Sequence, residues 1–235
     1  MRPFLLMITS ALAVAPVYAG EVSPAAKLAT PDGSKRAANK AVLQMPPASA
    51  HLEYAVLRDG SEVGRHVVDI ARQGNATDVT IKTQVAVSIA FITVYRFEHA
   101  AREHWSGTSL LSLKSRTNDN GTHHELSVAS AGDHLDVGAD GGKSTAPAHL
   151  LPASLWNAST VAQSSLLNTL DGHQMRVAVS DQGEDTVKVH GARTAAHHYK
   201  ISGGLARELW FDRTETLVRV AFAADDGSHI VYELQ

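Results

Sequence analysis

Histidine is unusually frequent in this sequence, with thirteen among 235 residues. Imidazole binds zinc and copper, and two ligands on one strand must lie two positions apart to share a face. Adjacent histidines point to opposite sides of a regular strand. The pairs His123-His124 and His197-His198 therefore do not have the spacing of metal ligands. His99 and His104 lie five positions apart and share a face only if a bulge intervenes. The one metal site that we can predict is therefore His99, Glu103 and His104; the alternative is that the histidines are exposed or hydrogen-bonded structural residues.

Glu103 precedes Trp105 by two positions, so a regular strand places both side chains on one face. A carboxylate beside an indole ring in a cavity can have a raised pKa and act as a general acid. The alternative is an ordinary ion pair at the edge of a strand, with Arg96, Arg102 or Arg116 as the partner. We favour the ion pair.

Motifs of the common enzyme classes are missing from the sequence. There is no Gly-x-Ser-x-Gly nucleophile turn, and Gly141-Gly-Lys-Ser144 lacks the glycine spacing of a phosphate-binding loop. The sequence contains no cysteine, which excludes thiol catalysis, iron–sulfur clusters and cysteine-ligated zinc. We therefore predict no catalytic residue and no cofactor, and we expect a protein that is not an enzyme.

Four aromatic residues are candidates for binding a ligand, because aromatic rings offer a large apolar area and indole adds one hydrogen-bond donor. They are Tyr95, Trp105, Trp156 and Trp210. At the mouth of a cavity they would hold a ligand, whereas in a core they only fill space. Trp156 belongs to a segment without strand pattern, where lids and functional loops tend to lie.

Strand patterns place these residues within a β-protein. Apolar residues alternate over 79–89, and the pattern continues over 91–105, with turns such as Asp59-Gly60 and Asn120-Gly121 between strands. Another turn is predicted at Gln182-Gly183, between strands over 174–179 and 186–190. Tight turns favour an antiparallel meander, since parallel strands need long crossovers.

About twelve short strands are predicted in all. An open sheet of that size curls or closes, so we expect a mainly β fold: a curved half-barrel or a barrel of the lipocalin or lipoprotein-carrier type. A two-sheet sandwich is the alternative. Residues 147–170 interrupt the strand pattern, and Asn157 is predicted to cap a short helix over 158–166.

The N-terminus has the three parts of a secretory signal. Arg2 is followed by an apolar run over residues 4–15, and Val17-Tyr18-Ala19 provides small residues for cleavage after Ala19. We thus predict a signal peptide at 1–19, a flexible lead-in at 20–50 and one β domain at 51–235. The protein is expected in the periplasm or the medium. No apolar run reaches the roughly 20 residues of a transmembrane helix.

Several segments together resemble a family of exported bacterial proteins described as a domain of unknown function. These segments are Phe91–His99, Glu103–Gly107, Leu113–Gly121, Leu151–Asn157, Leu209–Asp212 and Asp226–Ser228. The sequence is also loosely similar to other envelope β-proteins with a Glu-x-Trp strand and a Trp-Phe-Asp hairpin. The resemblance covers residues 54–234 and implies a curved, mostly antiparallel sheet. It carries over no catalytic residue.

The net charge of −3 offers no basic surface for nucleic acid, so we expect no nucleic-acid partner. The function that these observations favour is a binding or carrier module for an apolar or amphipathic, lipid-like small molecule. They are the strand meander, the segment 147–170, which can act as a lid, and the absence of catalytic motifs. The alternatives are an envelope-assembly or interaction protein and, less favoured, a hydrolase or metal-binding protein that uses histidine and glutamate. The oligomeric state is left open.

Overall fold

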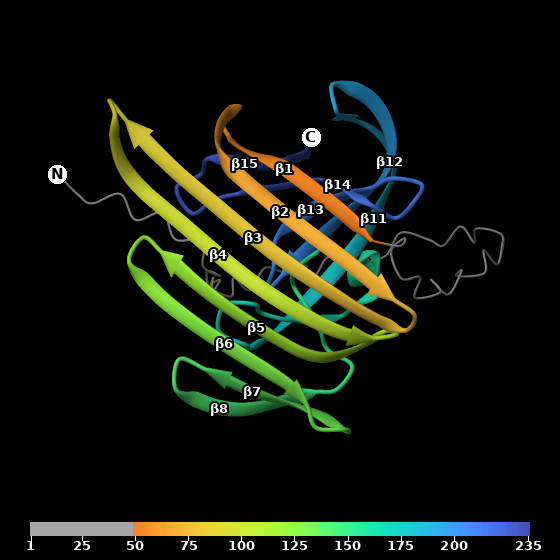
Figure 1. Ribbon diagram of the computed structural model, residues 1–235. Helices are drawn as coiled ribbons and strands as arrows, with labels where there is room; N and C mark the ends of the chain where they lie inside the picture. The colour runs from red at the N-terminus through yellow and green to blue at the C-terminus, as the bar shows by residue number, and fades with distance from the viewer. Residues whose placement is uncertain (1–48) are drawn as a thin grey trace, which may run out of the picture.

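The computed structural model describes residues 49–235, and in this range the chain forms one sheet of fifteen strands (Figure 1). Eight strands come first in the chain: β1 (Ala50–Arg58), β2 (Ser61–Gln73), β3 (Ala76–Ile89), β4 (Ile92–Ser106), β5 (Ser109–Asp119), β6 (Thr122–Ser130), β7 (His134–Ala139) and β8 (Gly142–Pro147). Then follow β9 (Leu151–Pro152), the 3₁₀ helix η1 (Ala158–Ala162), β10 (Ser165–Leu167), β11 (Gln174–Val189), β12 (Ala192–Gly203), β13 (Arg207–Phe211), β14 (Leu217–Ala223) and β15 (His229–Leu234).

The order of strands in the sheet follows the chain from β8 back to β1 and then from β15 back to β9. Strand β1 therefore pairs with β15 and joins the two halves, with Tyr54 opposite Leu234. Neighbouring strands are antiparallel except β9 and β10, which are parallel. The predicted antiparallel meander is confirmed.

Alternating side chains explain why one face of the sheet is buried. On β3, Val79, Ile81, Thr83, Val85 and Val87 are buried, while Lys82, Gln84 and Ala86 between them are exposed. Strands β3 and β4 pair over almost their whole length, which keeps the two alternating patterns in register. Burying each such aliphatic side chain contributes about 1.5–3 kcal/mol.

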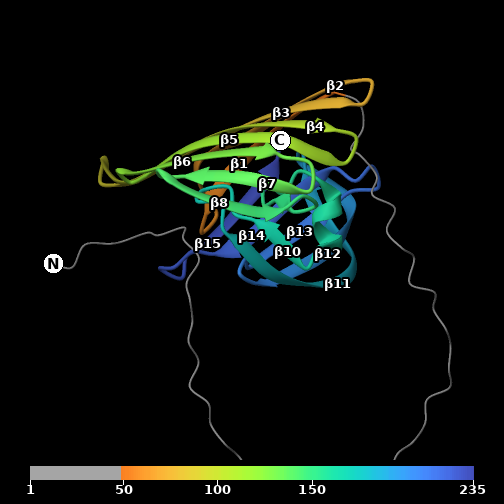
Figure 2. The same ribbon diagram turned by 90° about the horizontal axis from the view of Figure 1, so that it is seen from below.

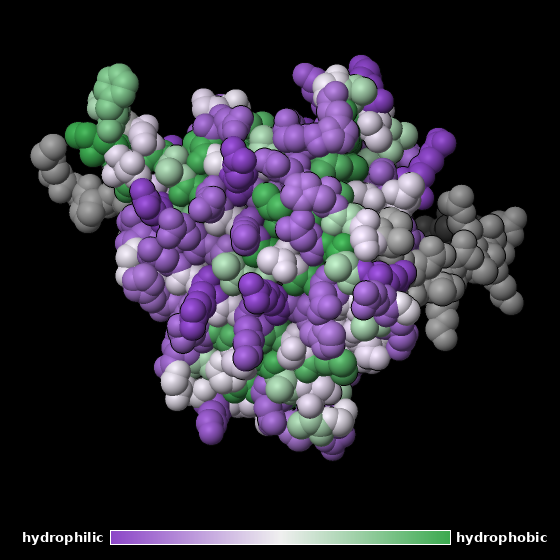
Figure 3. Space-filling model, in the orientation of Figure 1, coloured by the Kyte–Doolittle hydropathy of each residue, from purple (hydrophilic) through white to green (hydrophobic). Residues whose placement is uncertain are grey.

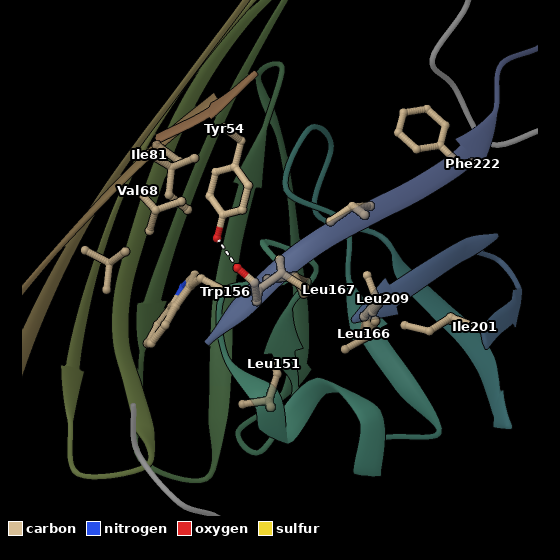
Figure 4. Packing of buried hydrophobic residues seen from close by; sticks show 14 of the residues in the cluster. Tyr54, Val68, Ile81, Leu151, Trp156, Leu166, Leu167, Ile201, Leu209 and Phe222 are labelled. Carbon is tan, nitrogen blue, oxygen red and sulfur yellow. Dashed lines mark hydrogen bonds between the residues drawn. The ribbon is translucent and has the colours of Figure 1, made fainter. Parts of the chain in front are cut away.

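The sheet curls over itself, so its buried face encloses the core. Figure 2 shows strands β2–β6 as one layer and strands β10–β14 as the other. Tyr54 on β1 reaches across and donates a hydrogen bond from its hydroxyl to the carbonyl of Leu217 on β14, at 2.7 Å (Figure 4). The packed side chains in Figure 4 come from both layers and from the segment between β9 and β10.

The segment from β9 to the start of β11 fills the space between the layers. Leu166 and Leu167 are completely buried, and the hydroxyl of Ser115 on β5 donates to the carbonyl of Thr169 at 2.6 Å. Gly172 has φ +73°, and a Cβ atom there would lie 2.5 Å from the Val137 side chain on β7. Side-chain packing by this segment therefore brings the two layers together.

Some details of the prediction need correction. Residues 49–235 form fifteen strands rather than about twelve, because β8, β9 and β10 lie in segments where the sequence predicts no strand. Gln182-Gly183 is not a turn: Gly183 (φ +85°) forms a bulge within the continuous strand β11, which keeps pairing with β12 on both sides.

The predicted short helix is a 3₁₀ helix that ends at Ala162, and Asn157 does cap it, accepting a hydrogen bond from the Ser159 N–H at 2.9 Å. The predicted signal peptide (1–19) and nearly all of the lead-in (20–50) lie outside the described residues. Within residues 49–235, no helix has the length and apolar character that crossing a membrane requires.

Candidate functional site

A cavity of about 580 Å³ lies between the two layers of the sheet. Its lining comes from strands β1–β4 on one side, from β14, β15 and the bend between β12 and β13 on the other, and from the segment after β9. Most of the inner wall is apolar; it includes Ile81, Phe97, Leu170, Met175, Leu217 and Val220. Exposed lining residues such as Gly204, Ala206 and Asp225 mark the rim.

Two neutral histidines line the cavity. The Nδ1 atom of His66 lies 2.8 Å from the Thr83 hydroxyl, and that of His99 lies 2.8 Å from the Thr117 hydroxyl. Burial lowers the pKa of His66 to about 3, with a smaller effect from His99, and burial lowers the pKa of His99 to about 4. Both imidazoles are therefore uncharged at neutral pH and can still form a hydrogen bond through Nε2.

Aromatic rings form a continuous row along the cavity. The ring centroids of Tyr54 and His66 lie 5.5 Å apart, those of His66 and Tyr232 5.3 Å, and those of Tyr232 and Phe222 6.1 Å. The Cζ atom of Arg207 lies 3.7 Å from the centroid of Phe222. The row therefore connects the deeply buried Tyr54 with the residues near the rim.

Arg207 is the one arginine in the cavity lining. It begins β13, and its Nη1 donates to the carbonyl of Ala206 at 2.7 Å. Burial lowers the pKa of Arg207 to about 10, so the guanidinium keeps its charge at neutral pH. No carboxylate among residues 49–235 forms a salt bridge with Arg207.

The residues of the predicted metal site are separated by the strand. His99 and Glu103 point inward from β4, whereas His104 points outward and pairs with Asp78. In the part of the chain that the structure describes, no three His, Cys, Asp or Glu residues are grouped to hold a metal ion. Seven histidines lie within 4.0 Å of a carboxylate instead: His51, His104, His124, His134, His173, His197 and His198.

Glu103 does not form the expected ion pair with an arginine. It is 2% exposed, and its Oε2 accepts hydrogen bonds from Trp105 Nε1 at 2.9 Å and from Trp156 Nε1 at 2.8 Å. The two indole rings pack edge to face, with centroids 5.8 Å apart. Burial raises the pKa of Glu103, while the side chain of Ser154 and the two indole N–H groups act in the opposite direction. This cluster ties the segment after β9 to β4.

The four aromatic residues predicted to bind a ligand lie outside the lining of this cavity. Trp105 and Trp156 belong to the Glu103 cluster. Tyr95 donates to Asp119 at 2.8 Å, and Trp210 donates to Asp185 at 2.8 Å. A role of these four residues in ligand binding stays a prediction.

Two polar cavity residues that we did not predict, Arg207 and His66, share a signal in the sequence. Each occupies a strand position that faces the same side as buried apolar residues two positions away. Arg207 alternates with Leu209 and Phe211 on β13, both of which are buried. His66 alternates in the same way with Val68 and Ile70 on β2. A polar side chain at an inward position of a strand is therefore the pattern that could have identified them.

Comparisons with known proteins agree with this fold. The sequence model of the family described as "Domain of unknown function (DUF6134)" matches residues 54–235. Among solved structures, the chain is similar to a beta-barrel-like protein of the domain of unknown function DUF1849 from Brucella abortus, with a TM-score of 0.58 and 9% sequence identity, covering 83% of this chain and 98% of that one. No curated protein matches the sequence.

Proposed function

The chain belongs to the DUF6134 family, and we propose that it binds an apolar or amphipathic small molecule in the cavity between the two layers of its sheet. The cavity itself is the observation that carries this proposal. Its volume of about 580 Å³ falls within the roughly 300–1,000 Å³ typical of ligand sites. Its lining has the expected composition too: apolar walls with a few polar groups that can orient a ligand.

The proposal places the protein in the cell envelope, as a carrier or binding module without catalytic activity. The predicted signal peptide at 1–19 supports export. Neutral imidazoles at His66 and His99 suit an apolar ligand, because they offer hydrogen bonds without a charge that the ligand would have to desolvate.

Filling the cavity should prevent binding. Leu205 lines the cavity in the bend between β12 and β13 and is half-buried, so a larger side chain can be accommodated there. We expect Leu205→Trp to weaken binding of the neutral fluorescent probe N-phenyl-1-naphthylamine by about tenfold or more, because the indole takes up part of the ligand volume. Fluorescence titration measures the affinity.

Leu111→Trp is the matched control, because Leu111 is an exposed leucine on β5 that is not part of the cavity lining. This variant should bind the probe as the wild type does. Absence of probe binding to the wild type, or equal affinity for the wild type and Leu205→Trp, would contradict the proposed function.

A second candidate function, contact with a lipid bilayer, is favoured by the tip of the β3–β4 hairpin. Phe91 is fully exposed (103%), Ile92 is 69% exposed and Val94 39%. The tip extends beyond the rest of the sheet, where Figure 3 shows a projecting group of apolar residues. Ala90 (φ 48°) and Phe91 (φ 68°) occupy the left-handed region that such turns normally reserve for Asn-Gly.

Ala90-Phe91 is a less favourable turn sequence than Asn-Gly and exposes an aromatic ring. Such a departure from the sequence that best stabilises the fold indicates that the tip has a function. Its area is small compared with the roughly 1,200 Å² of a stable protein interface, whereas an aromatic side chain inserts readily into the interfacial layer of a membrane. We infer that the hairpin tip touches the bilayer from which an amphipathic ligand is taken or to which it is delivered.

The double variant Phe91→Ser/Ile92→Ser should reduce sedimentation of the protein with phosphatidylethanolamine–phosphatidylglycerol vesicles by about fivefold or more, since it removes most of the exposed apolar area. Leu111→Ser, an exposed leucine elsewhere on the sheet, is the control and should sediment as the wild type does. If the wild type stays in the supernatant, or if the double variant sediments equally, the tip does not bind membranes.

A further inference from the structure

We propose that the cavity binds an amphipath with one anionic head group. The head group is a carboxylate or a phosphate monoester or diester and pairs with Arg207, while the apolar part of the ligand lies inside the cavity. This inference rests on the proposed function, because it specifies the ligand of the same cavity. It is carried by the charge, the contacts and the surroundings of Arg207.

Arg207 lacks the salt bridge that two other partly buried arginines, Arg58 and Arg219, form. Arg58 pairs with Asp226 at 2.6 Å and Arg219 with Glu233 at 2.9 Å. Arg207 has no carboxylate within 4.0 Å among the described residues, although its side chain is enclosed between the layers of the sheet. An enclosed charge without a salt bridge is unfavourable, and an anionic ligand that pairs with it offsets part of this cost when it binds.

The guanidinium is held in place before any ligand arrives. Phe222 stacks beneath it at 3.7 Å, and the Ala206 carbonyl accepts one of its hydrogen bonds. Arginine has five N–H donors in a planar fork that matches the oxygens of a carboxylate or phosphate. The donors that remain after the bond to Ala206 are available to a group in the cavity, and their fixed position reduces the entropy lost on binding.

Tyr232 offers a second donor beside Arg207. Its ring packs against Phe222, over which Arg207 lies, and it lines the same cavity as Arg207. Burial raises the pKa of Tyr232, so the phenol keeps its proton at neutral pH. Tyr232 and Arg207 can therefore donate to the same anionic group.

The remaining charges at the cavity limit the head group to a single anionic centre. His66 and His99 are neutral, and His124 and His173 already pair with Asp140 and Asp171. Asp225 at the rim adds a negative charge near Arg207, which disfavours a head group that carries several negative charges. One cation next to the rim that forms no salt bridge within the described residues, with apolar walls beyond it, fits an amphipath whose head lies near the opening.

The experiment compares ligands that share a twelve-carbon chain and differ only in the head group: dodecanoate, dodecyl phosphate, dodecanol and dodecyltrimethylammonium. Each displaces N-phenyl-1-naphthylamine from the protein, which measures its affinity. We expect the wild type to bind one or both of the anionic ligands about tenfold or more tightly than dodecanol, and the cationic ligand least tightly. Comparison of the first two ligands distinguishes a carboxylate from a phosphate source.

Arg207→Gln should remove this preference, so that the anionic ligands bind no more tightly than dodecanol, while Arg207→Lys should retain part of it. Arg219→Gln is the matched control, because Arg219 is partly buried but does not line the cavity. Equal affinity of the wild type for dodecanoate, dodecyl phosphate and dodecanol overturns the inference without any variant, and so does a preference that survives in a folded Arg207→Gln. Binding of dodecanol alone would leave the proposed function standing, whereas failure of all four ligands to bind would overturn both.

Discussion

Glu103→Leu is expected to lower the free energy of unfolding by about 2–4 kcal/mol, because it leaves the buried indole N–H groups of Trp105 and Trp156 without an acceptor. Both hydrogen bonds end on the same carboxyl oxygen, so one substitution breaks two contacts. The second of them connects β4 with the segment after β9, which packs between the layers of the sheet. Urea denaturation followed by circular dichroism measures the change.

Glu103→Gln is the control, because its amide oxygen can accept both indole N–H groups. Glu103 Oε1 has no hydrogen-bond partner among the described residues, so the amide nitrogen at that position breaks no existing bond. We expect a loss of about 1 kcal/mol or less for Glu103→Gln. If the two variants are equally stable, the hydrogen bonds to the indoles do not contribute as the structure indicates.

Acidification should destabilise the protein between about pH 6.5 and pH 4 through the two cavity histidines. In the folded protein the pKa of His66 is about 3 and that of His99 about 4, whereas an unfolded histidine titrates near its ordinary value of 6.5. In this window the unfolded state binds more protons than the folded state, so the free energy of unfolding falls as the pH falls. Each histidine contributes at most about 1.4 kcal/mol per pH unit.

Replacing both histidines isolates their contribution. His66→Gln/His99→Gln keeps a hydrogen-bonding group beside Thr83 and Thr117 but cannot titrate, so its stability should depend much less on pH in this window. The exposed pairs of His51 and His134 act in the opposite direction, because carboxylates raise the pKa of each histidine and the pairs are strongest below pH 6.5. They are unchanged in the variant. Parallel pH profiles for the two proteins, measured as thermal midpoints, would contradict the prediction.

Local patterns in the sequence were enough to predict most of the strands and most of their turns. Alternation over β3 and β4 identified two long strands with one buried face, and the structure confirms both. Asn120-Gly121 was predicted as a tight turn and joins β5 to β6. These features depend on residues close in the chain, since the two-residue period and the turn are set by neighbouring side chains and backbone angles.

The same patterns were less informative where the chain departs from regular pairing. Gly183 has the residue type of a turn, but pairing of β11 with β12 on both sides makes it a bulge. Strands β9 and β10 have only two and three residues, too few to show a period. Their pairing depends on β11, which comes later in the chain.

The roles of individual residues depended most on contacts between distant parts of the chain. Alternation correctly separates His99 and Glu103 from His104 on β4, but it cannot say what the inward side chains meet. Glu103 meets an indole 53 positions away, so it became part of the core and not an acid in a cavity.

Thus the sequence established a mainly β chain, its curved antiparallel sheet and the buried face of the long, regularly paired strands, because these properties repeat every two residues. It did not establish where the cavity lies, or that Arg207 lines this cavity without forming a salt bridge to any described residue. The position of the cavity and the surroundings of Arg207 depend on how β13 and β14 fold over β2 and β3. Side chains more than a hundred positions apart come together only when the sheet curls and buries its apolar face.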